Sequence, residues 1–347
     1  MLLENDRLIK ALKNQPVDRP PVWLMRQAGR YLPEYLATRA RAGSFMNLCQ
    51  TSELACEVTL QPIARFGLDA AILFSDILTI PDAMGLGLFF TEGEGPQFAR
   101  PLRSLDAIKQ LPIPDPMQSL GYVMDAVRLI KQTLHNTIPL IGFAGSPWTL
   151  ASYMLEGKSS RDFTVSKALL YSQPEAMQLL LDKLTMAVSA YLLAQIESGA
   201  DVVMVFDSWG GTLAQDAYLQ YSLASMQKIV QTLRAQAPHT PIITFTKGGN
   251  LWLPQIKQMG ADAIGLDWTI NLSDARKQLG QDICLQGNLD PSILFTNHSV
   301  VTENVRNILR QNGQNTGHIF NLGHGILPHT PIENVEALVA AVKAFEY

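Results

Sequence analysis

The sequence predicts a single (β/α)8 TIM barrel, and three observations support this prediction. Short apolar runs recur along the 347 residues, and helical patterns lie between them. The runs are continuously apolar, which is typical of parallel strands that are covered on both faces. Eight runs alternating with helices match a barrel, although a doubly wound open sheet is the main alternative. We expect one domain over residues 1–347, because no linker, low-complexity tract or charge run interrupts the chain.

Most of the apolar runs end in a glycine or a polar residue. In order they are PVWLM (21–25), AAILFSD (70–76), TIPLIGFAG (137–145), ADVVMVFDS (200–208), PIITFTKG (241–248), ADAIGLDW (261–268), ICLQGN (283–288) and HIFNLGHG (318–325). The helical patterns cover residues 52–67, 119–134, 174–199, 216–236, 302–313 and 331–345.

One connection between helix and strand occurs three times. The segments GLDAAILF (67–74), GADVVMVF (199–206) and GADAIGLD (260–267) each place a glycine at a helix end, followed by an aspartate and a strand. Glycine tolerates the left-handed conformation that often ends a helix. The repeated segment therefore predicts the same helix-to-strand loop at three places.

Composition and charge exclude several classes of protein. The chain is 47% hydrophobic and 17% charged, with a formal charge of −4, which argues against a nucleic-acid or anionic-membrane surface. We expect no signal peptide, and no apolar run approaches the length needed to span a bilayer. Three cysteines, at 49, 56 and 284, form no disulfide framework, so we expect a cytoplasmic protein.

In a barrel, functional side chains lie on the loops after the strands. The segment WLMRQAGRYLPEY (23–35) places Arg26 and Arg30 four residues apart after the first run, with Gly29 between them. Arginine binds carboxylates and phosphates through two parallel hydrogen bonds, so the pair predicts an anion site. The structural alternative is that one arginine caps the barrel and the other pairs with Glu34.

Four further strand-end or nearby residues have both a functional and a structural interpretation. Asp76 either faces a ligand or caps a local backbone N–H group. Ser208, in FDSWGG, either donates a hydrogen bond to a ligand or only shapes a turn. His324 lies between two glycines and either enters a pocket or packs structurally, while Tyr153 by itself is more simply a core or rim tyrosine.

Other motifs are missing. The segment GLGLFF (85–90) lacks the context of a dinucleotide-binding fingerprint, and there is no Walker A sequence. No cysteine stands with a histidine at zinc-ligand spacing, so we expect no metal site. The histidines at 135, 239, 298 and 329 receive no role.

Taken together, WLMRQAGRYLPEY, LFSDI, FDSWGG, LQGNLDP and NLGHGI resemble the uroporphyrinogen decarboxylase family over nearly the whole chain. FDSWGG and QGNLDP resemble its bacterial members. The resemblance implies a single barrel, a homodimer, no cofactor or metal, and removal of CO2 from the four acetate side chains of uroporphyrinogen III to give coproporphyrinogen III. It implies substrate contacts at a set of motif positions: Arg26, Gln27, Ala28, Gly29, Arg30, Phe45, Asp76, Tyr153, Ser208 and His324.

The same resemblance suggests roles for the reacting groups. Asp76 would stabilise the cation that forms when a pyrrole carbon is protonated. The proton donor stays open among Arg26, Tyr153, His324 and a bound water. Two alternatives are kept: a zinc- and corrinoid-linked methyltransferase of the same superfamily, which needs a zinc ligand set, and a non-catalytic tetrapyrrole-binding protein.

Overall fold

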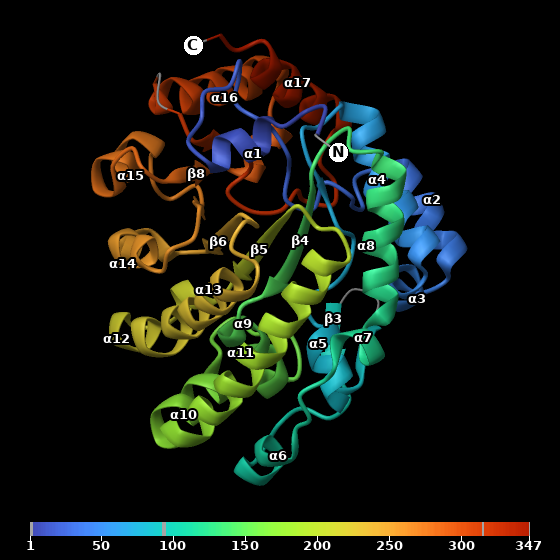
Figure 1. Cartoon of the computed structure of the whole chain (residues 1–347), viewed down its shortest axis with the longest axis vertical. Coiled ribbons are helices and arrows are strands. Elements are labelled where there is room, and N and C mark those ends of the chain that lie inside the picture. The colour runs from blue at the N-terminus through green and yellow to red at the C-terminus, as the bar shows by residue number, and fades with distance from the viewer. Residues whose placement is uncertain (1–2, 92–94, 314–315, 347) are drawn as a thin grey trace.

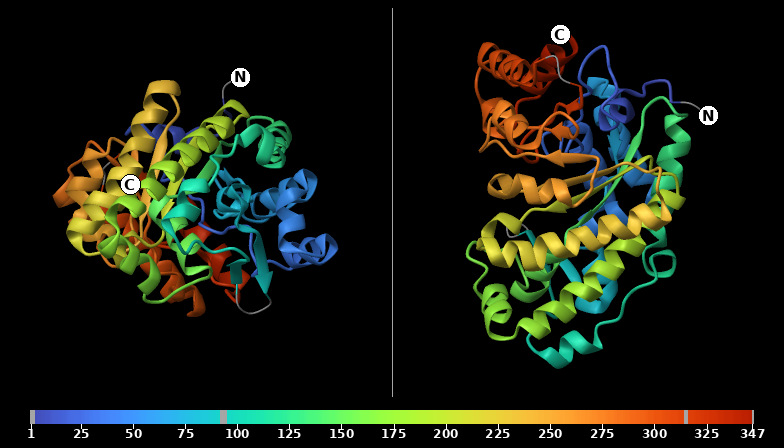
Figure 2. Two further views of the ribbon diagram at one scale, coloured as in Figure 1. Left: turned by 90° about the horizontal axis from the view of Figure 1, so that it is seen from below. Right: turned by 60° about the vertical axis from the view of Figure 1, so that its left-hand side comes forward.

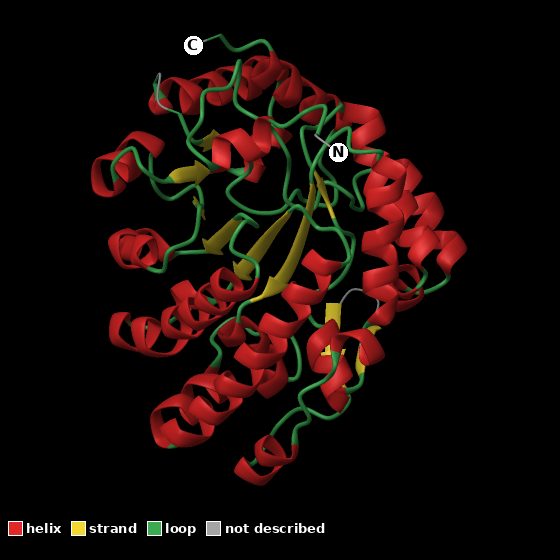
Figure 3. Ribbon diagram, viewed as in Figure 1, coloured by secondary structure: helices red, strands yellow, loops and turns green. Residues whose placement is uncertain are grey.

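The computed structural model describes residues 3–91, 95–313 and 316–346 and has the barrel architecture (Figure 1). One parallel sheet has the strand order β1-β4-β5-β6-β7-β8-β9. Its strands are β1 (Ala71–Ile72), β4 (Leu140–Gly145), β5 (Val202–Asp207), β6 (Ile242–Thr246), β7 (Ala263–Gly265), β8 (Cys284–Gln286) and β9 (His318–Ile319). These strands confirm seven of the eight predicted runs, and each is shorter than its run. Helices surround the strands on the outside, as the secondary-structure colours in Figure 3 show.

The first predicted strand, residues 21–25, is only a single bridge, in which Val22 pairs with Phe320 after β9. The amides of Leu24 and Met25 bond to side chains instead of a neighbouring strand, at 3.1 Å to Gln27 and 3.0 Å to Asn321. The bridge nevertheless closes the ring, because the amide of Asp69, just before β1, donates to the Val22 carbonyl at 2.9 Å. The prediction of a regular strand is therefore wrong, while the predicted barrel is confirmed.

The helices follow the predicted patterns where those were strong. The main ones are α2 (Pro33–Ala42), α4 (Ser52–Phe66), α8 (Gly121–Leu134), α9 (Pro147–Glu156), α10 (Thr164–Ser172), α11 (Pro174–Glu197), α13 (Ala224–Gln236), α15 (Leu272–Leu279), α16 (His298–Asn312) and α17 (Ile332–Lys343). Shorter helices are α1 (Arg7–Leu12), α3 (Phe45–Gln50), α5 (Thr79–Pro81), α6 (Leu105–Gln110), α7 (Pro116–Ser119), α12 (Gln215–Ala217) and α14 (Leu253–Gln258). Single turns of other helix types are η1 (Asp82–Leu86), η2 (Gly210–Thr212), η3 (Tyr218–Leu223), η4 (Gly249–Trp252) and η5 (Pro291–Phe295).

Two features differ from the expectations. A small hairpin of β2 (Leu88–Thr91) and β3 (Gly95–Phe98) was not predicted, and it occupies part of the GLGLFF segment. Helix α11 is long and apolar enough to cross a membrane, so the expectation that no such segment exists is wrong. In the fold, 61% of its most apolar window is buried, and the helix packs against β4, α9 and α13. Its apolar character is explained by this position in the core.

The structure confirms the repeated helix-to-strand loop, and the aspartate of each loop makes the same kinds of contact. Gly67, Gly199 and Gly260 all have positive φ angles. The aspartate of each loop accepts a hydrogen bond from the backbone at the start of a neighbouring strand region and pairs with a cation. The three pairs of contacts are Asp69 with the Val22 amide and Arg19, Asp201 with the Leu140 amide and Lys131, and Asp262 with the Ile242 amide and Arg234.

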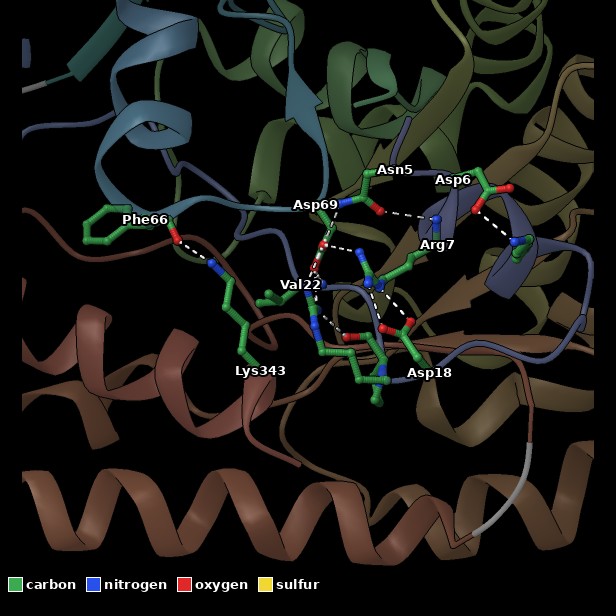
Figure 4. Close-up of polar contacts among 11 residues, drawn as sticks. Asn5, Asp6, Arg7, Asp18, Val22, Phe66, Asp69 and Lys343 are labelled. Atoms are coloured by element: carbon green, nitrogen blue, oxygen red, sulfur yellow. Dashed lines mark hydrogen bonds and ion pairs between the residues drawn. The ribbon is translucent and has the colours of Figure 1, made fainter. Parts of the chain in front are cut away.

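Polar contacts at Asp69 and at the nearby Phe66 join the two ends of the chain (Figure 4). Asn5 donates to the same carboxylate at 2.8 Å, and Arg19 binds it through two nitrogens at 2.7 and 2.8 Å. Close by, Lys343 at the end of α17 donates to the carbonyl of Phe66 at 2.9 Å. The N and C termini accordingly lie in the same half of the molecule, as the right-hand view of Figure 2 shows.

Candidate active site

The backbone after the first barrel segment turns sharply at Arg26. This residue has a φ of 61°, which is uncommon for a side chain other than glycine. Its side chain packs against Gly325, where an added Cβ atom would lie 2.4 Å from the Arg26 Cδ atom. Glycine at 325 therefore brings the loop after β9 into contact with the arginine.

Arg26 and Arg30 are both exposed, and in the described part of the chain neither forms an ion pair. The structural alternative for Arg30 is wrong, because Glu34 instead binds Arg65 through two bonds of 2.7 and 2.9 Å. Since an unpaired guanidinium carries a full positive charge and five donors, the two arginines can bind an anion.

A third arginine near this site was missed by the sequence reasoning. Burial raises the pKa of Tyr35 to about 12, and the charges of Arg39 and Arg30 oppose that shift. Both guanidinium groups therefore lie within electrostatic range of the same ring. Arg39 belongs to the segment ATRARA of α2, and the pattern of a surface helix does not distinguish it from Arg41.

Asp76 combines the two roles that the sequence left open. Its Oδ1 atom accepts a hydrogen bond from the Leu78 amide at 2.8 Å, which is the backbone-cap role. The residue is only half-buried, so part of its surface remains accessible besides the atom that accepts this bond. Burial raises the pKa of the carboxyl, and the Leu78 N–H group and the charge of Arg26 oppose this shift. The opposing charge places Asp76 and Arg26 in one electrostatic environment.

Tyr153, on α9, belongs to the same environment. Its ring centroid lies 6.2 Å from that of Trp209, and the residue is half-buried. Burial is the main reason that its pKa is raised; the charge of Asp76 adds to the shift and that of Arg26 opposes it. The tyrosine is therefore protonated near neutral pH and can donate a hydrogen bond or a proton.

The two polar residues at the end of β5 have different surroundings. Asp207 is fully buried and accepts bonds from the hydroxyls of Ser146, Thr149 and Ser222 at 2.6, 3.1 and 2.7 Å. These bonds fasten α9 and η3 to the sheet, so Asp207 is structural. The neighbouring Ser208 is half-buried, which leaves its hydroxyl partly accessible at the strand end.

His324 lies beside Arg26, in the loop after β9. Burial, together with the charges of Arg26 and Lys247, lowers the pKa of the imidazole to about 4, and the charge of Asp267 opposes this shift. The ring is therefore neutral near pH 7. The flanking Gly323 and Gly325 serve the packing of Trp268 and Arg26 rather than leaving an empty space around the histidine.

The remaining predicted contacts have mixed environments. The Gln27 side chain is buried and accepts from the Leu24 amide while it donates to the Ala70 carbonyl at 3.2 Å. Its backbone N–H donates to the Leu24 carbonyl at 2.9 Å and its carbonyl accepts from the Tyr31 hydroxyl at 2.8 Å, so Gln27 mainly shapes the turn. Ala28 and Gly29 are half-buried in the same turn. The Phe45 ring lies tilted against Phe90, with centroids 4.6 Å apart, and edge-on to Phe74 at 5.9 Å, which makes it part of an aromatic cluster.

Two other expectations concern residues outside this group. All three cysteines are buried and free. Within the described residues, no group of three or more His, Cys, Asp or Glu side chains is arranged to hold a metal ion.

A combination of unpaired arginines with a carboxylate of raised pKa and two uncharged donors is suited to an anionic substrate that becomes cationic during a reaction. Comparison with known proteins identifies the family. The profile described as uroporphyrinogen decarboxylase (URO-D) matches residues 3–345. The chain belongs to the uroporphyrinogen decarboxylase family.

Relatives of this family match over their whole length. A uroporphyrinogen decarboxylase of Alkalilimnicola ehrlichii is 58% identical over 98% of this chain and 94% of its own. Those of Shewanella loihica and Pseudomonas syringae are each 57% identical, over 98% of this chain and 97% of their own.

Among solved structures, a methyltransferase from Methanosarcina mazei superposes with a TM-score of 0.82 over 99% of both chains, at 22% identity. A B12-independent methionine synthase from a Shewanella species has a TM-score of 0.53 over 84% of this chain and 86% of its own, at 11% identity. At these identities the likeness shows a common barrel fold and no common activity.

Proposed function

We propose that this protein removes CO2 from the four acetate side chains of uroporphyrinogen III and releases coproporphyrinogen III. The main support is the sequence identity of 56–58%, over nearly the whole chain, to proteins of that name. The environment of Asp76, with unpaired arginines nearby, supports the same reaction.

Each decarboxylation needs an electron sink, and a protonated pyrrole provides one. A proton added to the pyrrole α-carbon, next to the ring carbon that bears the acetate, makes a pyrrole cation that is conjugated with the acetate methylene. The bond between the methylene and the carboxylate then breaks, CO2 leaves, and its electron pair neutralises the ring. Protonation of the methylene and loss of the ring-carbon proton leave a methyl group, so each cycle consumes one proton and releases one CO2.

In this proposal Asp76 stabilises the cation and accepts bonds from pyrrole N–H groups. Arg26 and Arg30 bind substrate carboxylates, while Ser208, Phe45 and the turn formed by Gln27, Ala28 and Gly29 complete the contacts. Tyr153 and His324 are the neutral donors beside the reacting ring. The raised pKa of Tyr153 and the lowered pKa of His324 favour Tyr153 over His324 as the proton source near pH 7.

The test is to incubate the purified protein with uroporphyrinogen under anaerobic, reducing conditions and to separate the products by carboxyl number. We expect porphyrins with seven, six, five and finally four carboxyl groups. Recovery of the eight-carboxyl compound alone would refute the proposal and leave the non-catalytic tetrapyrrole-binding alternative.

A chelation arm addresses the methyltransferase alternative, since that chemistry depends on zinc. We expect turnover to be unchanged after exhaustive treatment with EDTA or phenanthroline, and without an added cofactor. Loss of activity on chelation and its return with zinc would favour the methyltransferase.

The organisation of the protein is part of the proposal. We propose one cytoplasmic domain over residues 1–347, supported by the pairing of Val22 with Phe320 from the other end of the chain and by the free, buried cysteines. We also propose a homodimer that acts on a small molecule and binds neither nucleic acid nor membrane. Light scattering should give twice the chain mass at micromolar concentration, whereas a monomeric mass would contradict the dimer.

A further inference from the structure

Lys247, directly after β6, is a cation without a counter-ion among the described residues. The residue is half-buried, and its ammonium group lies 5.7 Å from the centre of the Trp268 ring, which is 38% exposed. In the part of the chain that the structure describes, no carboxylate forms an ion pair with it. An aromatic face stabilises an ammonium group but does not neutralise its charge.

The carboxylate of Asp267, whose charge acts on His324 as that of Lys247 does, is already occupied by other donors. It accepts bonds from the Gly248 amide at 2.5 Å, from the Asn250 side chain at 2.7 Å and from the Thr269 amide at 2.8 Å. These bonds hold the loops after β6 and β7 together. They leave Asp267 as a structural acceptor rather than as the partner of Lys247.

The backbone of Lys247 is held firmly. Its amide donates to the Asp207 carbonyl at 3.1 Å, and its carbonyl accepts from the Gly211 amide at 3.1 Å. An added Cβ atom at Gly211 would lie 2.3 Å from that carbonyl oxygen, so the two loops are in close contact. The cation is therefore carried on a rigid base at the end of β6.

The same packing connects Lys247 to the candidate active site. Trp268 lies against Gly323, where an added Cβ atom would be 2.6 Å from the Trp268 amide nitrogen. The positive charges of Arg26 and Lys247 both lower the pKa of the next residue, His324. Lys247 therefore adds a positive charge to the side of the site that is formed by the loops after β6, β7 and β9, and Trp268 lies beside it.

We propose that Lys247, supported by Trp268, binds a propionate carboxylate of the substrate. This inference rests on the proposed function, in which the acetates react in turn beside Asp76. In the sheet order, β4 and β5 separate β6 from β1, so Lys247 and the Asp76 loop approach the ligand from different sides. Propionates persist through all four steps, and a cation away from Asp76 can hold one in every step.

The experiment compares Lys247→Met, which removes the charge, with Lys247→Arg, which keeps it. Lys277→Met is the matched control, because the Lys277 side chain is 75% exposed on α15 and pairs with Asp274 at the surface. Two quantities are measured: the Kd of coproporphyrin, a ligand that carries four propionates and no acetates, by fluorescence titration, and the KM and kcat for uroporphyrinogen.

We expect Lys247→Met to raise both Kd and KM about tenfold, the effect of losing one charge-assisted hydrogen bond. The kcat should stay within about twofold, Lys247→Arg should recover most of the affinity, and Lys277→Met should match the wild type. An unchanged Kd in Lys247→Met would overturn the inference, as would equal losses in the Met and Arg variants. The titration needs no turnover, so a wild-type protein that binds coproporphyrin without decarboxylating uroporphyrinogen would refute only the proposed function.

Discussion

At the scale of single residues, Asp76 has a structural role in the fold and the charge-stabilising role that we propose. Asparagine is nearly the same shape and its Oδ1 atom can still accept from the Leu78 amide, which the carboxylate does at 2.8 Å. The change from Asp76 to Asn therefore removes the charge and keeps the cap. This separation makes the residue the most informative single position.

We expect Asp76→Asn to fold and to lower kcat roughly 100- to 1000-fold, with a smaller change in KM, because the charge acts mainly on a cation formed during the reaction. Steady-state kinetics measures both constants. Asp82→Asn is the control, since Asp82 also accepts a backbone bond, from the Leu88 amide at 2.7 Å. A wild-type kcat in Asp76→Asn would contradict the stabilising role, and failure to fold would make the cap its main function.

A second residue-scale prediction concerns Arg30. Lysine keeps the charge but loses the planar group that binds a carboxylate by two parallel bonds. We expect Arg30→Lys to lower kcat/KM by about one to two orders of magnitude, the cost of one charge-assisted hydrogen bond. The exposed Arg65→Lys, at the arginine that pairs with Glu34, should leave kcat/KM unchanged. Similar values for both variants would mean that Arg30 supplies only charge or structure.

At the scale of elements, the three loop aspartates join neighbouring strand regions at the end of the barrel that lies away from the candidate active site. Asp69 is the most buried of them and holds Arg19, the Val22 amide and Asn5 (Figure 4). The Val22 segment has only one bridge to β9, so it depends on this carboxylate more than a regular strand would.

We expect Asp69→Ala to lower the free energy of unfolding by roughly 3–5 kcal/mol, because it leaves a buried amide and a largely buried guanidinium without their acceptor. Urea unfolding at pH 7 measures the change. Asp18→Ala removes an exposed partner of Arg7 and should cost no more than about 1 kcal/mol. Equal stability of the two variants would show that the loop aspartates do not hold the barrel closed.

At the scale of the whole molecule, stability should depend on pH through buried histidines. Burial lowers the pKa of His318 to about 4, and its Nε2 atom lies 3.0 Å from the Gly287 carbonyl. An unfolded histidine has a pKa near 6.5, so between those values the unfolded chain binds more protons than the folded one. His318 therefore has no effect on the pH dependence of stability above pH 6.5, and below that pH it lowers the free energy of unfolding as the pH falls toward 4.

The test compares the wild type with His318→Gln by urea unfolding between pH 7 and pH 5. We expect the free energy of unfolding to fall less steeply in the variant, by up to about 1.4 kcal/mol per pH unit. The raised pKa values of Asp76 and Asp207 act in the opposite direction but are present in both proteins, so they cancel in the difference. Parallel pH profiles would show that His318 is not the titrating group.

The sequence by itself determined the barrel and the residues at its strand ends. Both follow from local properties: a strand covered on two faces must be continuously apolar, and a polar residue directly after it lies at the sheet edge. Arg26, Asp76, Ser208 and His324 could be selected in this way, and the three loop aspartates could be seen as a repeat.

Only the tertiary structure decided how backbone and side-chain groups from distant segments meet. The bonds of Leu24 and Met25 to Gln27 and Asn321 turn a predicted strand into a single bridge, and the pairing of Glu34 with Arg65 leaves Arg30 free. The place of Arg39 near Tyr35 is likewise invisible in the sequence, whereas Lys247 stands at a predicted strand end and only its pairing with Trp268 needed the structure. Hydrogen bonds and ion pairs depend on distances between side chains from different elements, which residue order does not contain.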